Sequence, residues 1–260
     1  MLSLNLETVH ELDLPAAVAA CVAGGIGSVG VWRHRVEEVG VARARALLDD
    51  AGLRVSSVCR GGFFTSDGAA EDNRLALRQT AGLGADLLVL VSGGLPSGSR
   101  DLVGARQRVV DGIAGMVPLA RELGVRLAVE PLHPMFCADR CVVSTLGQAV
   151  DVAAEFAADV VGVVVDTYHV WWDPDVLADI RRAGPRIFSY QLSDWRVPLP
   201  ADTLLGRAHV GDGVIDFAPL TEAVLAAGYT GDVEVEIFNA DVWAAPAAET
   251  IATVRERFGE

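Results

Sequence analysis

The sequence predicts a single (β/α)8 barrel, a TIM barrel, in which residues 1–260 form one domain. Three observations predict this fold. The length of 260 residues fits the roughly 250 residues of such a barrel. Several short runs, VVGVVVD among them, are almost wholly apolar, which is typical of strands buried on both faces of a parallel sheet. Eight such runs alternate with about eight helical patterns, which favours a closed barrel over an open doubly wound sheet.

The predicted strands are short β-branched or leucine-rich runs. In chain order they are Ser3–Leu6, Ser28–Trp32, Arg54–Cys59, Asp86–Val91, Arg126–Glu130, Val160–Asp166, Arg186–Leu192 and Asp232–Ile237. Between strands, apolar residues recur at three- and four-residue spacing in Glu37–Ala51 and Gly104–Leu123, which predicts amphipathic helices there. Predicted helix stops are Gly52, Gly84, Gly124, Gly184 and Gly228, and predicted helix starts are Ser144, the Asp173-Pro174-Asp175 run and Asp216.

The composition excludes several classes of function. The chain has a net charge of −14 and no lysine, so lysine Schiff-base chemistry and the lysine-dependent phosphate loop are both excluded. The acidic balance disfavours nucleic-acid binding, which needs clustered positive charge. No apolar run approaches the roughly 20 residues of a membrane span, and the N-terminus lacks a basic, apolar leader, so we expect a cytoplasmic protein without a membrane partner. The four cysteines form no CxxC pair, and we expect reduced thiols rather than a zinc site.

Polar side chains end four consecutive strands late in the chain. Glu130, Asp166, Gln191 and Glu236 close or follow the fifth to eighth predicted strands. The carboxyl ends of barrel strands meet at one mouth, and buried carboxylates are costly there unless they are paired or bind a metal. These oxygen donors suit Mg²⁺, Mn²⁺ or Co²⁺, so the four residues form a predicted site for one divalent ion. The alternative is that each acid caps a helix or pairs with an arginine.

Two histidines and two basic positions stand close to these strand ends. His133 and His169 each follow an acidic strand end by three residues and could contact substrate or carry a proton, although either could instead stabilise a loop. Arg207 precedes the GDGVIDF turn and is a candidate substrate contact. Arg60 opens an Arg60-Gly61-Gly62 loop that could approach a ligand, although a simple turn is the alternative.

Tryptophans cluster near the same predicted strand ends. Trp172 and Trp195, with Trp171 and Trp243, are candidates for an apolar wall beside a ring-shaped ligand. Ordinary loop packing would explain each of them singly.

The segments AVEPLHP, VVVDTYHVWWD, YQLSD, GDGVIDF and VEVEIF together resemble the sugar phosphate isomerase/epimerase superfamily, the xylose-isomerase-like barrels. This superfamily includes ketose epimerases, hydroxypyruvate isomerase and inosose dehydratase. The resemblance implies that Glu130, Asp166 and Glu236 are metal ligands, with Gln191 where many members carry histidine. It also implies a substrate contact at His169. Phe136 stands where the ketose epimerases carry a further glutamate, which departs from their pattern.

The chemistry implied by the resemblance is proton abstraction next to a carbonyl through a metal-stabilised enediolate. Glu130 and Glu236 would act as base and acid, assisted by His169, on a small sugar or sugar-derived substrate. The expected cofactor is one divalent ion, Mn²⁺ before Mg²⁺ or Co²⁺, with no organic cofactor. We expect an isomerase or epimerase. The alternatives are a lyase or dehydratase on a keto-sugar, keto-glycoside or cyclitol, and a non-catalytic binding or partner subunit. Homo-oligomer formation is left open.

Overall fold

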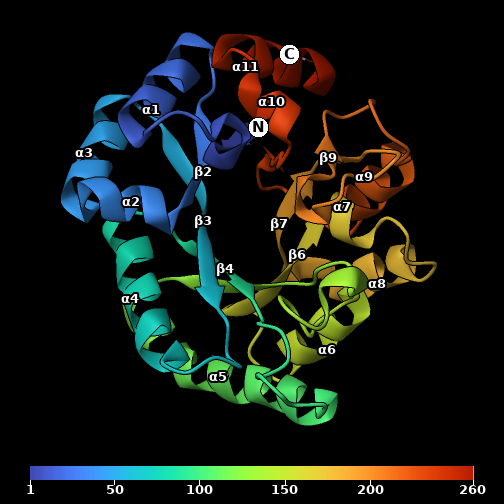
Figure 1. The fold of residues 1–260 in the computed structure, drawn as a ribbon. Helices are drawn as coiled ribbons and strands as arrows, with labels where there is room; N and C mark the ends of the chain where they lie inside the picture. Colours follow the sequence, from blue (N-terminus) through green and yellow to red (C-terminus); the bar gives the residue numbers. More distant parts are fainter. Residues whose placement is uncertain (260) are drawn as a thin grey trace.

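The computed structural model describes residues 1–259, and it contains the predicted closed parallel barrel with helices outside it (Figure 1). Around the barrel the strands follow the order β1-β10-β7-β6-β5-β4-β3-β2. Their bounds are β1 (Leu2–Asn5), β2 (Ser28–Trp32), β3 (Arg54–Gly62), β4 (Leu87–Val91), β5 (Arg126–Glu130), β6 (Val161–Asp166), β7 (Ile187–Leu192) and β10 (Val233–Val235). A small antiparallel pair, β8 (Asp194–Trp195) and β9 (Arg207–Ala208), lies outside the barrel.

Helices follow the strands and form the outer ring of Figure 1, which ends with α11 beside the N-terminus. Short 3-10 turns cover Leu6–Val9, Pro134–Phe136, Gly184–Arg186 and Thr203–Leu205. The helices are α1 (Leu14–Ala23), α2 (Arg33–Val39), α3 (Val41–Asp50), α4 (Ala69–Gly82), α5 (Leu102–Leu123), α6 (Leu146–Ala154), α7 (Thr167–Val170), α8 (Val176–Ala183), α9 (Phe217–Ala226), α10 (Ala240–Ala244) and α11 (Ala247–Phe258).

Two local predictions were wrong. The helix predicted over Glu37–Ala51 is interrupted at Gly40, whose φ of 80° ends α2 and begins α3. The predicted Arg60-Gly61-Gly62 loop is instead the end of β3, where Gly61 and Gly62 pair with β4. Gly62 has a φ of 104°, and a Cβ there would lie 2.0 Å from the Val91 carbonyl oxygen. Only glycine permits this close approach, so β3 continues through a sequence that resembles a turn.

Alternation along the strands decides which side chains enter the barrel. Ala128 and Val164 belong to a small buried cluster with Leu87, Val89 and Phe188, separate from the main core between strands and helices. Side chains alternate along a strand, so residues two apart lie on the same face. Glu130 therefore lies on the face of Ala128, and Asp166 lies on the face of Val164. The acids therefore continue the interior of the barrel at its carboxyl end.

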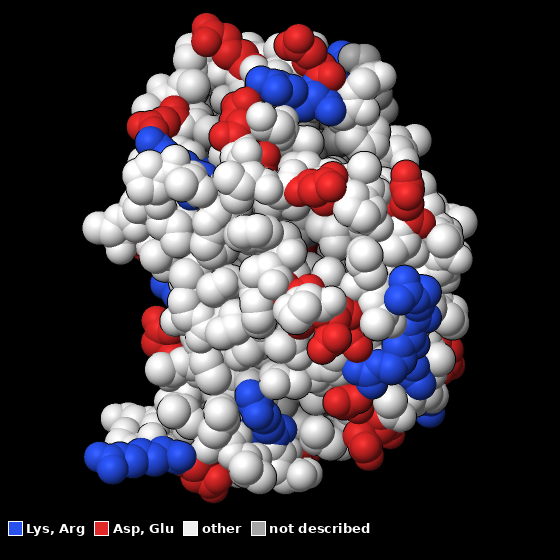
Figure 2. Space-filling view, turned by 90° about the vertical axis from the view of Figure 1, so that its right-hand side faces the viewer, with Lys and Arg blue, Asp and Glu red and all other residues white. Residues whose placement is uncertain are grey.

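The surface mixes charges of both signs. Figure 2 shows acidic side chains interspersed with small groups of arginine on the face that it displays. Within residues 1–259, no helix combines the length and the apolar character required to cross a membrane.

Candidate active site

The carboxyl end of the barrel brings three acids to one cavity. Glu130 ends β5, Asp166 ends β6, and Glu236 follows β10 directly. Glu130, Asp166 and His169 each offer a ligand atom within 4.8 Å of the others. A cavity of about 150 Å³ opens beside them, with Glu130, Glu236 and His169 in its wall. The predicted convergence of the acids is therefore present in the fold.

Arg207 lies between two of these acids, so the alternative of pairing with an arginine is present for Asp166 and Glu236. Its Nη2 atom donates to Asp166 Oδ2 at 2.8 Å and lies 3.2 Å from Glu236 Oε2. Its Nη1 atom donates to the Ser193 hydroxyl at 2.8 Å. The predicted contact between Arg207 and substrate is untested, but the residue lines the cavity and is 2 % exposed. The Arg207 guanidinium thus neutralises part of the negative charge of these acids.

Gln191 lies one strand from Asp166 and is oriented by Glu234 beneath it. The Gln191 Nε2 atom donates to Glu234 Oε1 at 3.2 Å, and this contact fixes the orientation of the Gln191 amide. The other amide atom, Gln191 Oε1, is buried and accepts no hydrogen bond within residues 1–259. A buried amide oxygen without a donor is costly, and a cation would satisfy it.

Glu234 itself is held by a polar network inside the barrel. Asn5 donates to its Oε1 at 2.8 Å, and the hydroxyls of Ser56 and Ser57 each donate to its Oε2 at 2.8 Å. Gly30 leaves room for this carboxylate, since a Cβ at Gly30 would lie 2.4 Å from Glu234 Oε1. The alternation VEVE puts Glu234 on the same face as Glu236, which is the signal by which the sequence could have revealed it.

His169 is a neutral imidazole beside the acids. The His133 backbone N–H donates to His169 Nδ1 at 3.2 Å, so the ring proton lies on Nε2. That Nε2 lies 3.9 Å from Asp166 Oδ2. An Arg207 nitrogen lies 3.2 Å from the same Nε2, and this is a contact between two donors rather than a hydrogen bond. Burial lowers the pKa of His169 to about 3, which keeps the ring neutral.

Burial and mutual repulsion perturb the acids strongly. Burial raises the pKa of Glu130 well above its usual range, and the charges of Asp166 and Glu236 raise it further. Burial also raises the pKa of Glu236 to about 8, although Arg207 opposes this. Burial alone would lower the pKa of Arg207, but Asp166 and Glu236 raise it above its ordinary value. Such perturbation within one cavity is typical of functional sites.

Most of the remaining predicted substrate contacts do not line the cavity. Within residues 1–259, the cavity lining includes Arg60 but not His133, Trp172 or Trp195. Trp195 stacks on Tyr168 with ring centroids 4.8 Å apart, and His133 packs edge-on against Trp172 at 5.3 Å. Other apolar residues, none of them predicted contacts, line the cavity: Trp32, Phe63, Leu132, Leu204 and Phe238.

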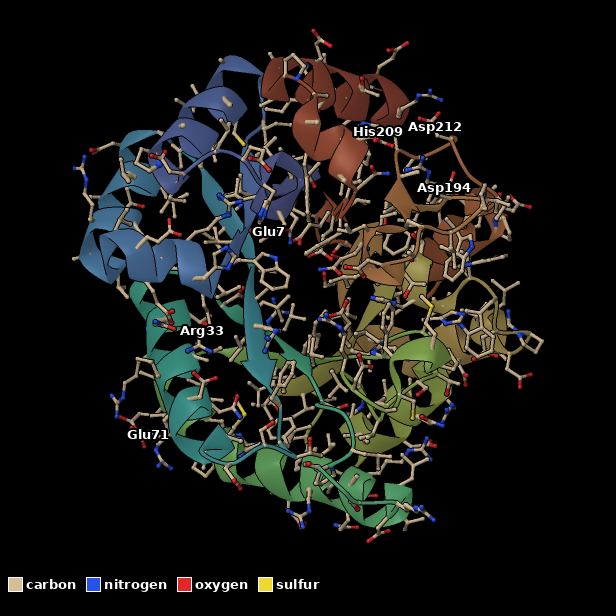
Figure 3. All side chains as sticks on the ribbon, viewed as in Figure 1. Glu7, Arg33, Glu71, Asp194, His209 and Asp212 are labelled. Carbon is tan, nitrogen blue, oxygen red and sulfur yellow. The ribbon has the colours of Figure 1, made fainter. Side chains whose placement is uncertain are left out.

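A buried aspartate organises the loop that carries Arg207. Asp194 accepts hydrogen bonds from the backbone N–H groups of Gly211, Gly213 and Ile215 at 2.8–3.0 Å. Figure 3 places Asp194 near His209 at the same side of the barrel. The turn is thereby fixed to β8, which pairs with β9 and positions Arg207.

The donor set fits a divalent cation. Glu130, Asp166 and Glu236 supply anionic oxygens, Gln191 supplies an unsatisfied neutral oxygen, and His169 lies within reach of two of the acids. Oxygen-rich sets of this kind suit hard or borderline divalent ions. The four oxygen donors could hold one ion beside the cavity, whereas His169 would contact it only through other groups because its Nε2 carries the ring proton.

Two proteins of known name are similar to this chain in sequence. The inosose isomerase of Bacillus licheniformis is 31 % identical over 151 residues, which are 56 % of this chain and 52 % of the isomerase. The chain thus matches about half the length of that relative. The 3-dehydroshikimate dehydratase of Pseudomonas putida is 30 % identical over 256 residues, 92 % of this chain but 38 % of the dehydratase.

A solved structure, protein SMc04130 from Sinorhizobium meliloti 1021, superposes with a TM-score of 0.95 at 46 % identity and covers 99 % of this chain and 96 % of its own. The profile of the family described as "Xylose isomerase-like TIM barrel" matches residues 18–257. The chain therefore belongs to the xylose isomerase-like TIM barrel family.

Proposed function

We propose that this protein is a divalent-metal-dependent enzyme that removes a proton next to a carbonyl group of a small, sugar-derived substrate. The convergence of Glu130 and Glu236 in the wall of one small cavity, with Asp166 buried beside them, carries the proposal, and the unsatisfied Gln191 oxygen supports it. The relatives named as an inosose isomerase and a dehydratase fit the same first step. Glu130, Asp166, Gln191 and Glu236 would hold the ion, which when bound supplies a Lewis acid.

The protein's own residues would then divide the proton transfers between them. Both Glu130 and Glu236 face the cavity, where each carboxylate could exchange a proton with a bound substrate. The His169 Nε2–H is a donor in the same wall, positioned to hold a substrate oxygen. Arg207 keeps Asp166 charged and in place.

Deuterium exchange tests this proposal. A cyclic ketone such as an inosose, incubated in D₂O with the Mn²⁺-loaded protein, should gain deuterium next to its carbonyl. Glu130→Gln and Glu236→Gln should each slow that exchange by about 10²–10⁴-fold, whereas exposed Glu122→Gln should not change it. Exchange that continues at full rate after chelation would contradict the metal requirement, and exchange unchanged in both cavity variants would exclude the assigned acids.

Elimination is a second candidate outcome of the same first step. Phe136 meets His169 edge-on at 5.9 Å, so an apolar ring is adjacent to the histidine where the ketose epimerases carry an acid. The cavity walls of Trp32, Phe63 and Phe238 also suit a ring better than an open polyol chain. Loss of water would produce a conjugated ketone whose ultraviolet absorbance rises with time. Recovered, deuterated isomer without that absorbance would favour isomerisation.

A further inference from the structure

Two arginines line the candidate cavity without a protein partner. Arg60 and Arg140 are both half-buried in its wall. Within residues 1–259, neither guanidinium forms an ion pair or donates a hydrogen bond. The other arginines without such partners are all exposed to solvent: Arg43, Arg78, Arg100, Arg108 and Arg181. A partly buried cation without a counter-charge is unfavourable, so Arg60 and Arg140 need a specific explanation.

The backbone that carries Arg60 and Arg140 is fixed, and the Arg60 guanidinium is also stacked on a ring. The guanidinium of Arg60 stacks over Phe63, with its Cζ 3.7 Å from the ring centroid. The Arg60 carbonyl accepts a hydrogen bond from Arg33 at 3.1 Å, and Arg33 is anchored in turn by Asp72. The Arg140 N–H donates to the Phe136 carbonyl at 3.0 Å, just before Cys141 bridges to the end of β4. Both side chains therefore start from fixed backbone.

Repulsion between like charges adds to the cost of this arrangement. Burial lowers the pKa of Arg60, and the positive charges of Arg33 and Arg140 lower it further, while Cys59 and the charge of Asp72 only partly oppose this. The acids at the base of the cavity do not relieve this, because Arg207 pairs with Asp166 and Glu236 instead. An anionic group placed between Arg60 and Arg140 would relieve it.

We propose that Arg60 and Arg140 form a subsite for a carboxylate carried by the substrate. This inference rests on the proposed function, since it concerns the same cavity. A cavity of about 150 Å³ has room for a six-membered ring. A planar carboxylate also matches the paired donors of guanidinium groups. The substrate would thus be a compact keto acid whose carboxylate lies at the arginines and whose carbonyl lies near Glu130 and Glu236.

Matched ligands of equal size test the subsite without any turnover. Calorimetry on the Mn²⁺-loaded protein would compare a cyclohexanone carboxylate with its uncharged carboxamide. The carboxylate should bind about tenfold more tightly or better, since hydrogen bonds to a charged group are stronger than those to a neutral amide. Equal affinity for acid and amide would overturn the proposal. Tighter binding of dihydroxyacetone phosphate than of the carboxylate would overturn the assignment to carboxylate.

Variants then assign the effect to the two side chains. Arg60→Gln and Arg140→Gln should each weaken carboxylate binding about tenfold or more and leave carboxamide binding unchanged. Arg60→Lys, which keeps the charge, should retain part of the preference, and exposed Arg100→Gln is the control. A melting temperature within about 2 °C of wild type would show that each variant is folded.

The two proposals fail separately. A retained preference for carboxylate in both glutamine variants would exclude this subsite while the exchange chemistry stands. Charge-selective binding without any deuterium exchange would exclude the proposed function while the subsite stands.

Discussion

Arg207 offers the sharpest test of how the site balances its charges. Arg207→Met keeps most of the side-chain volume but removes the charge and every donor to Asp166, Glu236 and Ser193. All three partners are buried, so the carboxylates cannot regain water. Breaking a buried ion pair from one side typically costs about 3–5 kcal/mol. For a domain of this size, the melting temperature should fall by about 6–20 °C.

The control is another arginine from the same region of the chain. Arg196 pairs with Asp241 at 2.8 Å, but both side chains are largely exposed, at 44 % and 77 %. Arg196→Met should therefore cost about 1 kcal/mol or less. Calorimetry compares the melting temperatures of the two variants after a chelator has removed any metal. Adding Mn²⁺ should raise the melting temperature of Arg207→Met more than that of wild type, because the ion replaces lost positive charge. Equal losses in the two variants would refute the charge balance inferred for the site.

Three further outcomes are expected. Gly112→Ala should destabilise the protein by about 1–3 kcal/mol, because the new Cβ would lie 2.2 Å from the Phe64 ring. Gly115→Ala, in the same helix with nothing within 4 Å of the new Cβ, should stabilise the protein by about 0.5–1 kcal/mol. Urea denaturation measures the free energy of unfolding of both variants. A change of the same sign in both would contradict the packing. Burial opposes ionisation of Glu7, but His34 and Arg35 lower its pKa to about 2, so its stabilisation is complete above the unfolded pKa and is lost as pH falls toward 2. Glu7→Gln should therefore destabilise by roughly 3 kcal/mol at pH 7 and much less at pH 3, and a loss that does not depend on pH would contradict this.

The barrel could be predicted because its signals are local. Strand candidates such as Ser28–Trp32 and Arg126–Glu130 were confirmed to the residue, since runs that are apolar on both faces leave few other structures. The errors also have local causes. Gly40 divides a continuous helical pattern through its backbone conformation, and the Gly61-Gly62 pair extends β3 where only glycine permits the approach of β4.

The candidate site could be predicted only in part, because pairing partners far apart in sequence carry no local signal. The strand ends placed Glu130 and Asp166 in one mouth, and the structure agrees. The ion pair of Arg207 with Asp166 spans 41 positions and depends on the small β8–β9 pair. The position of Arg140 in the wall depends on a loop with no regular pattern. Direct substrate contacts by His133, Trp172 and Trp195 stay predictions.

The arginine changes the argument for a metal rather than removing it. The cost of three buried, converging carboxylates first suggested that the site needs a cation. With Arg207 in place, Glu130, Asp166 and Glu236 still carry two negative charges in excess when ionised. Without a further cation, the raised pKa values of Glu130 and Glu236 indicate that protons fill this deficit. A divalent ion supplies the missing two charges and would displace those protons, so ion binding should release protons and strengthen as pH rises. Glu234 lies below this set, where four neutral donors hold its carboxylate, and its charge adds to the repulsion that raises the pKa values of Glu130 and Glu236.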